Sequence, residues 1–363
     1  MKVALIGTGL IGGSIGLALK AGTDTTIVVA FDTDAAAAKR AVERGAADVV
    51  AATATDAARD ADFVFIATPV GAITDSVAGI ADSVSSGSVV TDVGSTKSRV
   101  VLEAEQALRQ GSDFIGGHPM AGTEQEGIEA ASATLYQGAW WILTPTERSS
   151  SDAYRKLHGL LATLGARIMA LDPAEHDKLM AVISHVPQLT ATALMNMAAK
   201  RGEEHAGLLA LAAGGFRDVT RVAASNPEIW LDICKENGEA IAATLHDFAN
   251  ELLSLRDLIV DRREGQLRDA FLQAREARRG LPGKEVHEAP YEVFMLVPDR
   301  PGVLAQVTTS IGNLGINIED LQITHSSEGG RGVLHLTIAG RAQAEKVSAA
   351  LRDQGFETRT SEL

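Results

Sequence analysis

The 363-residue chain is poor in several kinds of residue, and each shortage narrows the class of protein. Its single cysteine, Cys234, cannot support a disulfide framework, which disfavours a secreted scaffold and favours a reducing cytoplasm. Lys and Arg number 33 against 47 Asp and Glu, and the resulting net charge of -14 disfavours nucleic acid and anionic membranes as partners. No apolar run approaches the roughly 18 residues that span a bilayer. The sequence therefore predicts a cytoplasmic protein without nucleic-acid or membrane partners.

Apolar runs rich in β-branched residues alternate with helical periodicity over residues 1–172. This alternation predicts βαβ units and a parallel sheet covered on both faces by helices, an α/β dinucleotide-type fold. We expect strands at 2–6, 26–31, 62–67, 88–93, 113–116, 139–144 and 166–171, and helices at 11–21, 34–45, 71–84, 96–110 and 150–163.

Residues 173–281 carry little strand signal and predict an all-helical domain, with helices at 174–200, 203–212, 226–261 and 264–279. Its apolar residues recur at spacings of three and four, as they do from Leu245 to Ile259. Such a stripe is either a subunit interface or an ordinary core. Residues 282–290 form an expected linker, and the βαββαβ pattern of 291–363 predicts a small ferredoxin-like α+β domain.

A glycine-rich loop follows the first expected strand and opens the first expected helix. Its G-x-G-x-x-G pattern consists of Gly7, Gly9, Leu10, Ile11 and Gly12, with Thr8 between the first two glycines. In this context the pattern predicts a dinucleotide site, because the glycines allow a tight turn and a close approach of the pyrophosphate to the helix N-terminus.

The coenzyme is predicted from Asp32, which ends the second expected strand, 20 residues after Gly12. A carboxylate at this place accepts hydrogen bonds from the adenosine ribose and repels a 2′-phosphate. No Lys or Arg follows before Lys39. The sequence therefore predicts NAD rather than NADP, and we identify no metal site.

Two further loops leave strand ends on the edge where such folds perform chemistry. Thr68 and Pro69 are expected beside the nicotinamide ribose. Ser95, Thr96 and Lys97 lie at the start of an expected helix, a place suited to a polar or anionic group. The alternative for these three residues is N-capping of that helix.

The stretch FIGGHPMAGTE, residues 114–124, holds His118 in an expected glycine-rich loop after the strand 113–116. Histidine titrates near neutral pH and is suited to remove a hydroxyl proton as a hydride leaves the same carbon. The alternative is a loop histidine bonded only to backbone. With the dinucleotide loop present, we expect His118 to be catalytic.

Five segments, GTGLIGGS, DVGSTK, GGHPMAGTE, HDKLMAVISHVPQ and GGFRDVTRVAASNPEIW, resemble the prephenate dehydrogenase family in the same order. The resemblance extends over about residues 1–280. It implies NAD-dependent oxidative decarboxylation of prephenate to 4-hydroxyphenylpyruvate in tyrosine biosynthesis, by a homodimer joined through the helical domain.

The same resemblance implies roles for individual residues. His118 would take the proton of the C4 hydroxyl, and Ser95 would hydrogen-bond near the same oxygen. Arg221 would pair with a substrate carboxylate, although a structural ion pair with Asp218 is an alternative. Glu124 would belong to a charge network at the cleft.

Four positions in the helical domain need separate judgement. His185 matches the family's Ser-His-x-Pro pattern and is expected in the active site. His176 lies nine residues earlier, half a turn out of phase on a straight helix, and suits an N-terminal turn or a subunit contact. Gln188 stands where the family often has a second histidine, so its contact with the substrate side chain is open. For Trp230 we expect a structural role.

Residues 291–363 resemble an ACT domain through VPDRPGVL, from Val297, and GINI, from Gly315. By analogy an amino acid effector, tyrosine by pathway logic, would bind near Asp299, Gly302 and Asn317. The alternative is a purely structural dimerisation module.

Other functions remain open at this point. Arogenate differs from prephenate only in carrying an amino group in place of the ketone, so arogenate or dual cyclohexadienyl dehydrogenase activity is the main alternative. A β-hydroxyacid or imine reductase would need a signature lysine that we do not find. An NAD-bound regulatory protein would need no proton acceptor.

Overall fold

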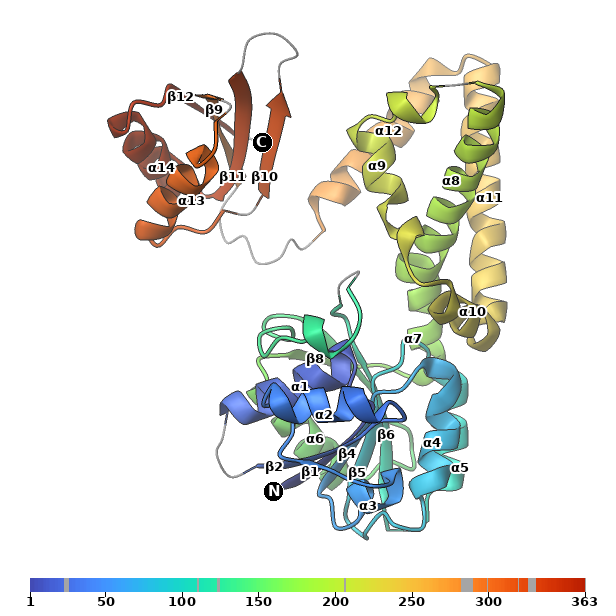
Figure 1. Ribbon diagram of the computed structural model, residues 1–363. Coiled ribbons are helices and arrows are strands. Elements are labelled where there is room, and N and C mark those ends of the chain that lie inside the picture. Colours follow the sequence, from blue (N-terminus) through green and yellow to red (C-terminus); the bar gives the residue numbers. More distant parts are fainter. Residues whose placement is uncertain are drawn as a thin grey trace. The chain divides into compact units, whose positions relative to one another are not determined.

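The computed structural model describes residues 1–22, 26–109, 111–122, 125–205, 207–281, 290–298, 300–318, 320–325 and 331–362. The chain forms two compact units, Met1–Arg263 and Glu264–Leu363 (Figure 1). Among the described residues no helix is both long and apolar enough to cross a membrane, and no cluster of side chains could hold a metal ion.

The first unit is built on an eight-stranded sheet with the strand order β3-β2-β1-β4-β5-β6-β7-β8. The strands are β1 Lys2–Ile6, β2 Ile27–Phe31, β3 Val49–Val50, β4 Phe63–Ile66, β5 Val89–Asp92, β6 Asp113–Pro119, β7 Trp140–Thr144 and β8 Arg167–Ala170. The helices are α1 Leu10–Gly22, α2 Ala35–Glu43, α3 Ala54–Ala58, α4 Ile73–Ile80, α5 Ser98–Ala107 and α6 Ser151–Thr163.

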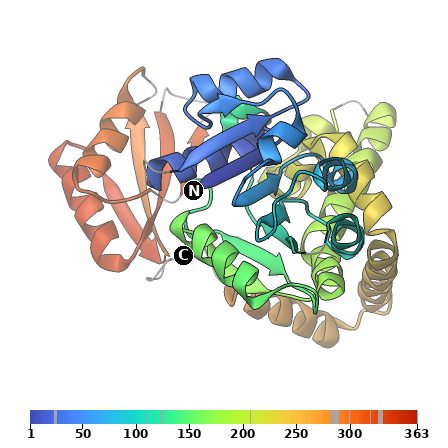
Figure 2. The same ribbon diagram turned by 90° about the horizontal axis from the view of Figure 1, so that it is seen from below.

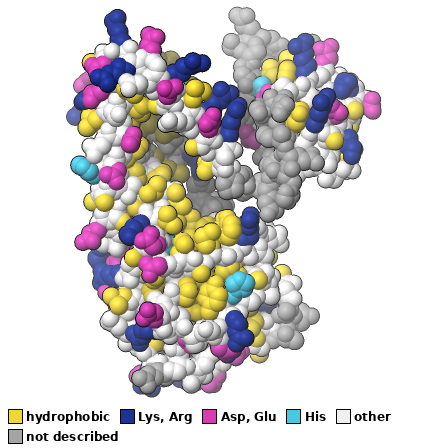
Figure 3. Space-filling model, turned by 180° about the vertical axis from the view of Figure 1, so that it is seen from behind, with side chains coloured by type: hydrophobic (Ala, Val, Ile, Leu, Met, Phe, Trp, Pro, Cys, Tyr) yellow, Lys and Arg dark blue, Asp and Glu magenta, His cyan; other side chains and the backbone are white. Residues whose placement is uncertain are grey.

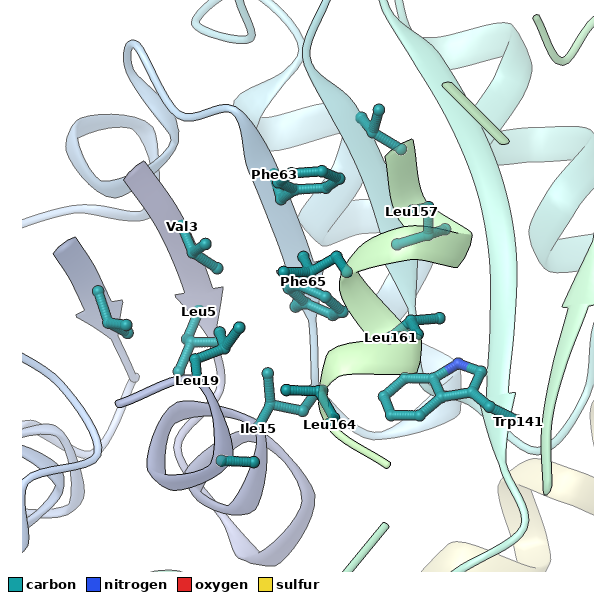
Figure 4. Close-up of a cluster of buried hydrophobic side chains, with 14 of the residues drawn as sticks. Val3, Leu5, Ile15, Leu19, Phe63, Phe65, Trp141, Leu157, Leu161 and Leu164 are labelled. Carbon is teal, nitrogen blue, oxygen red and sulfur yellow. The ribbon is translucent and has the colours of Figure 1, made fainter. Parts of the chain in front are cut away.

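Both faces of this sheet are covered, as the sequence predicted. Helices α1 and α6 pack on one face, and α4 and α5 pack on the other (Figures 1 and 2). Figure 4 shows the first of these cores, in which Leu5, Phe65 and Trp141 from the strands meet Leu157 and Ile15 from the helices. The Rossmann-type fold is therefore confirmed.

The part of the sheet that carries His118, strand β6, differs from the prediction. We expected a fully parallel sheet, but β7 runs antiparallel to β6, with His118 opposite Ile142. His118 therefore lies in a strand, and the expectation of a loop was wrong. The glycines before it serve close packing, since a Cβ at Gly117 would lie 2.6 Å from the carbonyl oxygen of Asp92. The short elements β3 and α3 were not predicted.

The helical part of the first unit begins at Pro173. It consists of α7 Pro173–Met180, a π-helical turn Ala181–His185, α8 Val186–Glu204, α9 Gly214–Thr220, α10 Pro227–Glu236 and α11 Gly238–Val260, with 3-10 turns at Leu209–Leu211 and Arg221–Ala224. The helix expected at 203–212 is wrong, because α8 continues to Glu204 and Gly207, at φ +98, does not continue a helix.

The second unit contains α12 Glu264–Arg279 and a four-stranded antiparallel sheet with the order β10-β11-β9-β12. Its elements are β9 Pro290–Pro298, α13 Val303–Asn313, β10 Asp320–His325, β11 Arg331–Ala339, α14 Arg341–Asp353 and β12 Thr358–Glu362. The predicted βαββαβ order is confirmed. Most of the expected linker lies outside the described residues.

Candidate active site

The glycine loop after β1 has the geometry that a dinucleotide requires. Gly7 has φ +98, and a Cβ there would lie 2.4 Å from the carbonyl oxygen of Ala67. At Gly12 a Cβ would lie 2.1 Å from the carbonyl oxygen of Gly7, so only glycine allows this helix to start so close to the loop. A Cβ at Gly9 would meet no atom within 4 Å, which leaves open space beside the backbone. Leu10 and Ile11 open α1 behind this space.

Asp32 is held against the same loop. Its Oδ2 accepts hydrogen bonds from the backbone N–H of Thr8 at 2.7 Å and from the Thr8 hydroxyl at 2.9 Å. Its Oδ1 accepts from the N–H of Asp34 at 2.9 Å. The carboxylate thus stands at the end of β2, where the ribose hydroxyls of an adenine dinucleotide would lie.

The loop after β4 adds polar and apolar contacts on the same edge of the sheet. The hydroxyl oxygen of Thr68 is buried and has no hydrogen-bond partner among the described residues, so it is available to a ligand. Pro69 is exposed and precedes the 3-10 turn Val70–Ala72. Together with Asp32 and the glycine loop, these residues fit a dinucleotide.

His118 makes an unexpected contact with the helical part of the unit. Its Nδ1 lies 2.9 Å from the Nε2 of His176, which is on α7 and fully buried. The two rings meet edge to face with centroids 5.1 Å apart. His176 lies in the N-terminal turn of α7, one of the two predicted roles, and the sequence did not predict that it also touches the candidate base.

The next residue, Asp177, connects this histidine pair to the start of α5. Asp177 Oδ1 lies 2.9 Å from Nδ1 of His176. The two carboxylate oxygens also accept from the N–H groups of Lys97 at 2.7 Å and Ser98 at 2.8 Å. Burial raises the pKa of Asp177, but the hydrogen bonds from His176, Ser98 and Lys97 outweigh burial and hold the pKa below its ordinary value.

Asp177 also corrects the expected role of the loop after β5. We considered N-capping of α5 by Ser95 or Thr96, but the helix begins at Ser98 and its first N–H groups are capped by Asp177 from the helical part. Thr96 is buried, and its hydroxyl has no hydrogen-bond partner among the described residues. Ser95 is half-buried in the same loop.

The hydrogen-bond network assigns the proton positions on the two rings. An ionised carboxylate only accepts, so Nδ1 of His176 carries a proton and, in the neutral ring, Nε2 carries a lone pair. This lone pair accepts the Nδ1 proton of His118. The Nε2 of His118 therefore carries a lone pair, as a general base requires.

A buried ion pair lies beneath the base. Lys97 and Asp92, both fully buried, form an ion pair. Asp92 also accepts from the N–H of Gly94 at 2.8 Å and from that of Gly117 at 3.1 Å, and Gly117 precedes the base. The ion pair therefore fixes the backbone of the loop after β5 and of β6 next to the base.

The surroundings keep His118 neutral. Burial lowers its pKa well below the usual 6.5, and the nearby His176, Lys97 and His185 lower it further, against the opposing effect of Asp177. A histidine with a lowered pKa is unprotonated at neutral pH. The neutral ring of His118 can therefore accept a proton from a substrate at neutral pH.

His185 ends the π-helical turn and is 1% exposed. Pro187 lacks the N–H that a regular α-helix needs, and a π turn has more residues per turn, which changes the phase between His176 and His185. Asn237 connects this turn to the residue after His176: its Nδ2 lies 3.2 Å from Nδ1 of His185 and 2.8 Å from the backbone carbonyl oxygen of Asp177.

The remaining predicted residues lie at different depths. Gln188 is buried one turn after His185, and Trp230 meets the His185 ring edge to face with centroids 6.1 Å apart. Arg221 is exposed and starts a 3-10 turn that packs on α8. Glu124 lies outside the described residues.

Of the predicted effector residues, Asp299 lies outside the described residues, whereas Gly302 and Asn317 are exposed in the second unit. Gly302 has φ +92 and precedes α13. The left-handed conformation explains the glycine at this position.

Sequence reasoning missed Asp177, Asn237 and the pairing of His118 with His176. The one available signal was the dipeptide His176-Asp177 at the start of a helix. A carboxylate beside a histidine is suited to orient the ring, but the sequence does not show which strand lies opposite.

A glycine-loop nucleotide site and a neutral histidine on the carboxyl edge of one sheet define the first unit as a nicotinamide dinucleotide-dependent dehydrogenase. Comparison with known proteins gives the family. Models of the prephenate dehydrogenase nucleotide-binding domain and dimerization domain match residues 15–170 and 172–273, and a model of the ACT domain matches residues 291–356.

The chain is 33% identical to prephenate dehydrogenase of Bacillus subtilis over 92% of this chain and 91% of that protein. The structure of prephenate dehydrogenase from Aquifex aeolicus with hydroxyphenyl propionate and NAD+ is similar, at 29% identity and a TM-score of 0.73, over 77% of this chain and 97% of that one. Synechocystis arogenate dehydrogenase is 31% identical with a TM-score of 0.69, over 77% and 99%. The chain belongs to the prephenate dehydrogenase family.

Proposed function

We propose that this protein is an NAD-dependent prephenate dehydrogenase, which converts prephenate to 4-hydroxyphenylpyruvate and CO2 in tyrosine biosynthesis. The observation that carries the proposal is the hydrogen-bonded chain from Asp177 through His176 to His118, because it leaves a lone pair on Nε2 of a neutral histidine. Family membership over most of the chain supports the same substrate and cofactor.

The chain's own residues handle one proton. NAD, when bound, supplies the acceptor for the hydride that leaves C4 of the substrate. Nε2 of His118 accepts the proton of the C4 hydroxyl, so the oxygen can form a carbonyl as C4–H breaks. The bond from C1 to the carboxylate then breaks, its electrons enter the ring, and CO2 leaves. The imidazolium returns its proton to the phenolate oxygen, which restores the base.

The proton taken from the C4 hydroxyl stays with the protein until the phenolate forms. His118 becomes an imidazolium while it holds the proton, and the ionised Asp177 stabilises this charge through His176. Burial of His118 disfavours the charged form, so its imidazolium is more acidic than that of an exposed histidine and returns the proton readily. The arrangement suits a group that takes a proton and returns it in one turnover.

We assign the other predicted residues to binding, in line with the family resemblance. Ser95 would donate to the C4 oxygen and Thr96 would donate its unpartnered buried hydroxyl to a substrate or cofactor oxygen. Arg221 would pair with a carboxylate as the substrate binds, with Glu124 in the same charge network. Gln188 and His185 would face the same buried cluster, since they lie three residues apart on one helix side.

Initial rates of NADH formation with prephenate and with arogenate test this function. Likeness to Synechocystis arogenate dehydrogenase and the amide of Gln188 favour arogenate as the second candidate. We expect prephenate to be oxidised with NAD at a higher kcat/KM than arogenate. A preference for arogenate would assign the second activity, and no turnover of either would leave a regulatory NAD-binding protein.

We propose that two copies associate through the helical part. The residues Val182, Ile183, Met197, Leu231, Leu252 and Ile259 are large, apolar and exposed there. Hydrophobic side chains are visible on the surface of the molecule in Figure 3. The apolar stripe between Leu245 and Ile259 has no fully buried member, which favours an interface over a core. The match to a dimerization domain supports a homodimer.

We also propose that the ACT domain senses an amino acid, tyrosine by the logic of product inhibition. Gly302, at the N-terminus of α13, leaves room for a carboxylate, and Asn317 is exposed and offers an amide.

The single cysteine of the chain, Cys234, supports a location in the reducing cytoplasm.

A further inference from the structure

The side chain of Asn237 has one orientation that its neighbours allow. Asn237 lies between α10 and α11 and is 6% exposed. Its amide nitrogen lies 2.8 Å from the backbone carbonyl oxygen of Asp177. A carbonyl oxygen only accepts hydrogen bonds, so the NH2 group of the amide, and not its oxygen, must face Asp177. The hydrogen-bond partner therefore fixes an assignment that is otherwise ambiguous.

The fixed amide determines which nitrogen of His185 carries the proton. The same Nδ2 of Asn237 lies 3.2 Å from Nδ1 of His185. An amide nitrogen only donates, so Nδ1 of His185 carries a lone pair and the proton of the neutral ring is on Nε2. Burial lowers the pKa of His185 to about 4, so the ring stays neutral at physiological pH.

The proton on Nε2 of His185 has no acceptor within the described part of the chain. The Nε2 atom is buried, and the residue as a whole is 1% exposed. A buried N–H is normally hydrogen-bonded, so an acceptor from a ligand is the expected partner. Asn237, which contacts Nδ1 of His185, also contacts the backbone carbonyl oxygen of Asp177, the residue next to the partner of the candidate base.

We propose that Asn237 is a positioning residue that holds His185 as a neutral Nε2–H donor for a carboxylate oxygen of the bound substrate. The inference rests on the proposed function, which supplies a substrate with two carboxylates. A carboxylate is the stronger acceptor for this donor, whereas the substrate's hydroxyl gives its own proton to His118. His118 and His185 thus have opposite tautomers. Asp177 sets that of His118 through His176, and the amide of Asn237 sets that of His185.

Nitrogen NMR of the free enzyme tests the tautomer without any turnover. We would label the full-length protein with 15N-histidine and identify the His185 signals from the spectrum of His185→Gln. In the wild type we expect an unprotonated Nδ1 and a protonated Nε2. In Asn237→Asp the carboxylate accepts from Nδ1, so the proton should move there. A protonated Nδ1 in the wild type would overturn the proposal.

Steady-state kinetics with prephenate test whether Nε2–H of His185 donates to a carboxylate of the substrate. Loss of a hydrogen bond to a charged group should raise KM in Asn237→Asp about tenfold to a hundredfold, with a smaller change in kcat. The double variant Asn237→Asp with His185→Gln should recover much of this loss, because a glutamine amide can donate near the place of Nε2 whatever its neighbour. Asn237→Asp with His185→Leu has no donor and should not recover.

The matched control is Asn226→Asp, which makes the same change at the other end of α10. Asn226 caps that helix by accepting from the N–H of Glu228 at 3.0 Å, and aspartate caps equally well, so KM should be unchanged. A merely structural role for Asn237 would give no recovery by His185→Gln, and this result would overturn the proposal. If the wild type fails to oxidise prephenate, the proposed function falls, while the NMR result still decides the tautomer.

Discussion

Nδ1 of His118 lies 2.9 Å from Nε2 of His176, although the two residues are 58 positions apart in the chain. His118 belongs to the sheet and His176 to the first helix after it, so the base acquires its tautomer from a different layer of the unit. Two further contacts hold these layers together: Gly71 N–H donates to Asp232 at 3.1 Å, and Arg99 pairs with Glu236 at 3.3 Å. The proton chemistry thus depends on the packing between sheet and helices.

The variant Asp177→Asn tests whether Asp177 sets the tautomer of His118 through His176. In Asp177→Asn the amide can present its NH2 group to His176, which would then accept at Nδ1 and donate from Nε2, so that His118 would lose its lone pair at Nε2. We expect kcat to fall by about 10²- to 10⁴-fold, the range known where a histidine is held in the wrong tautomer.

The control for this variant is Asp172→Asn. The carboxylate of Asp172 caps α7 through the N–H groups of Ala174 and Glu175, whereas only its backbone carbonyl meets His176, by accepting from the His176 N–H. It shares the capping role of Asp177 without the carboxylate contact to the His176 ring, so its rate should stay close to that of the wild type. Equal losses in both variants would assign the effect of Asp177 to helix stability alone.

The pH dependence of kcat/KM reports the pKa of His118 in the free enzyme. Burial first, and then the neighbouring His176 and Lys97, hold this pKa well below 6.5. The base is active when unprotonated, so activity should remain level as the pH falls from 8 to 6.5 and decline only at lower pH. An acid limb centred at or above pH 6.5 would contradict the environment described for His118.

The coenzyme preference depends on Asp32. Replacement by serine removes the acceptor for the ribose hydroxyls and the charge that repels a 2′-phosphate, so Asp32→Ser should raise the KM for NAD about tenfold and narrow the preference over NADP. Asp34→Ser is the matched control, because Asp34 caps α2 two residues further on. The KM for NAD and for NADP is measured in both variants. An unchanged ratio of the two KM values in Asp32→Ser would contradict the assignment of Asp32 to the ribose.

Regulation by the second unit is tested in the full-length enzyme with Asn317→Ala. We expect the basal rate to persist and inhibition by tyrosine to weaken, because the variant removes an amide that would hold the amino acid. Asn313→Ala, at the last residue of α13, is the control. Inhibition unchanged in Asn317→Ala would show that tyrosine acts elsewhere, including at the active site.

The sequence predicted the sheet, the helices on both faces and the nucleotide loop, because apolar periodicity and glycine spacing are local signals. It predicted the strand at 113–116 but not its continuation through His118 to Pro119, because the sequence after Gly116 is typical of a loop. The role of Gly116 and Gly117 appears only in three dimensions: a Cβ at Gly116 would lie 2.4 Å from the Thr144 hydroxyl, and neighbouring strands need that space.

The roles of His176 and Asn237 were beyond sequence reasoning for a related reason. A regular helix puts His176 and His185 half a turn out of phase, and the π-helical turn between them, Ala181–His185, alters this phase. Asn237 lies 52 positions from His185, and no local pattern connects them.

The most direct test of the account is the rate of NADH formation from prephenate by His118→Asn, measured in a single turnover with saturating NAD. We predict a rate at least about 100-fold below that of the wild type, with NAD binding unchanged by fluorescence titration, because the variant removes the proton acceptor and leaves the nucleotide loop intact. A single-turnover rate within about twofold of the wild type, which is less than general-base catalysis contributes, would contradict the assignment of His118 as the base.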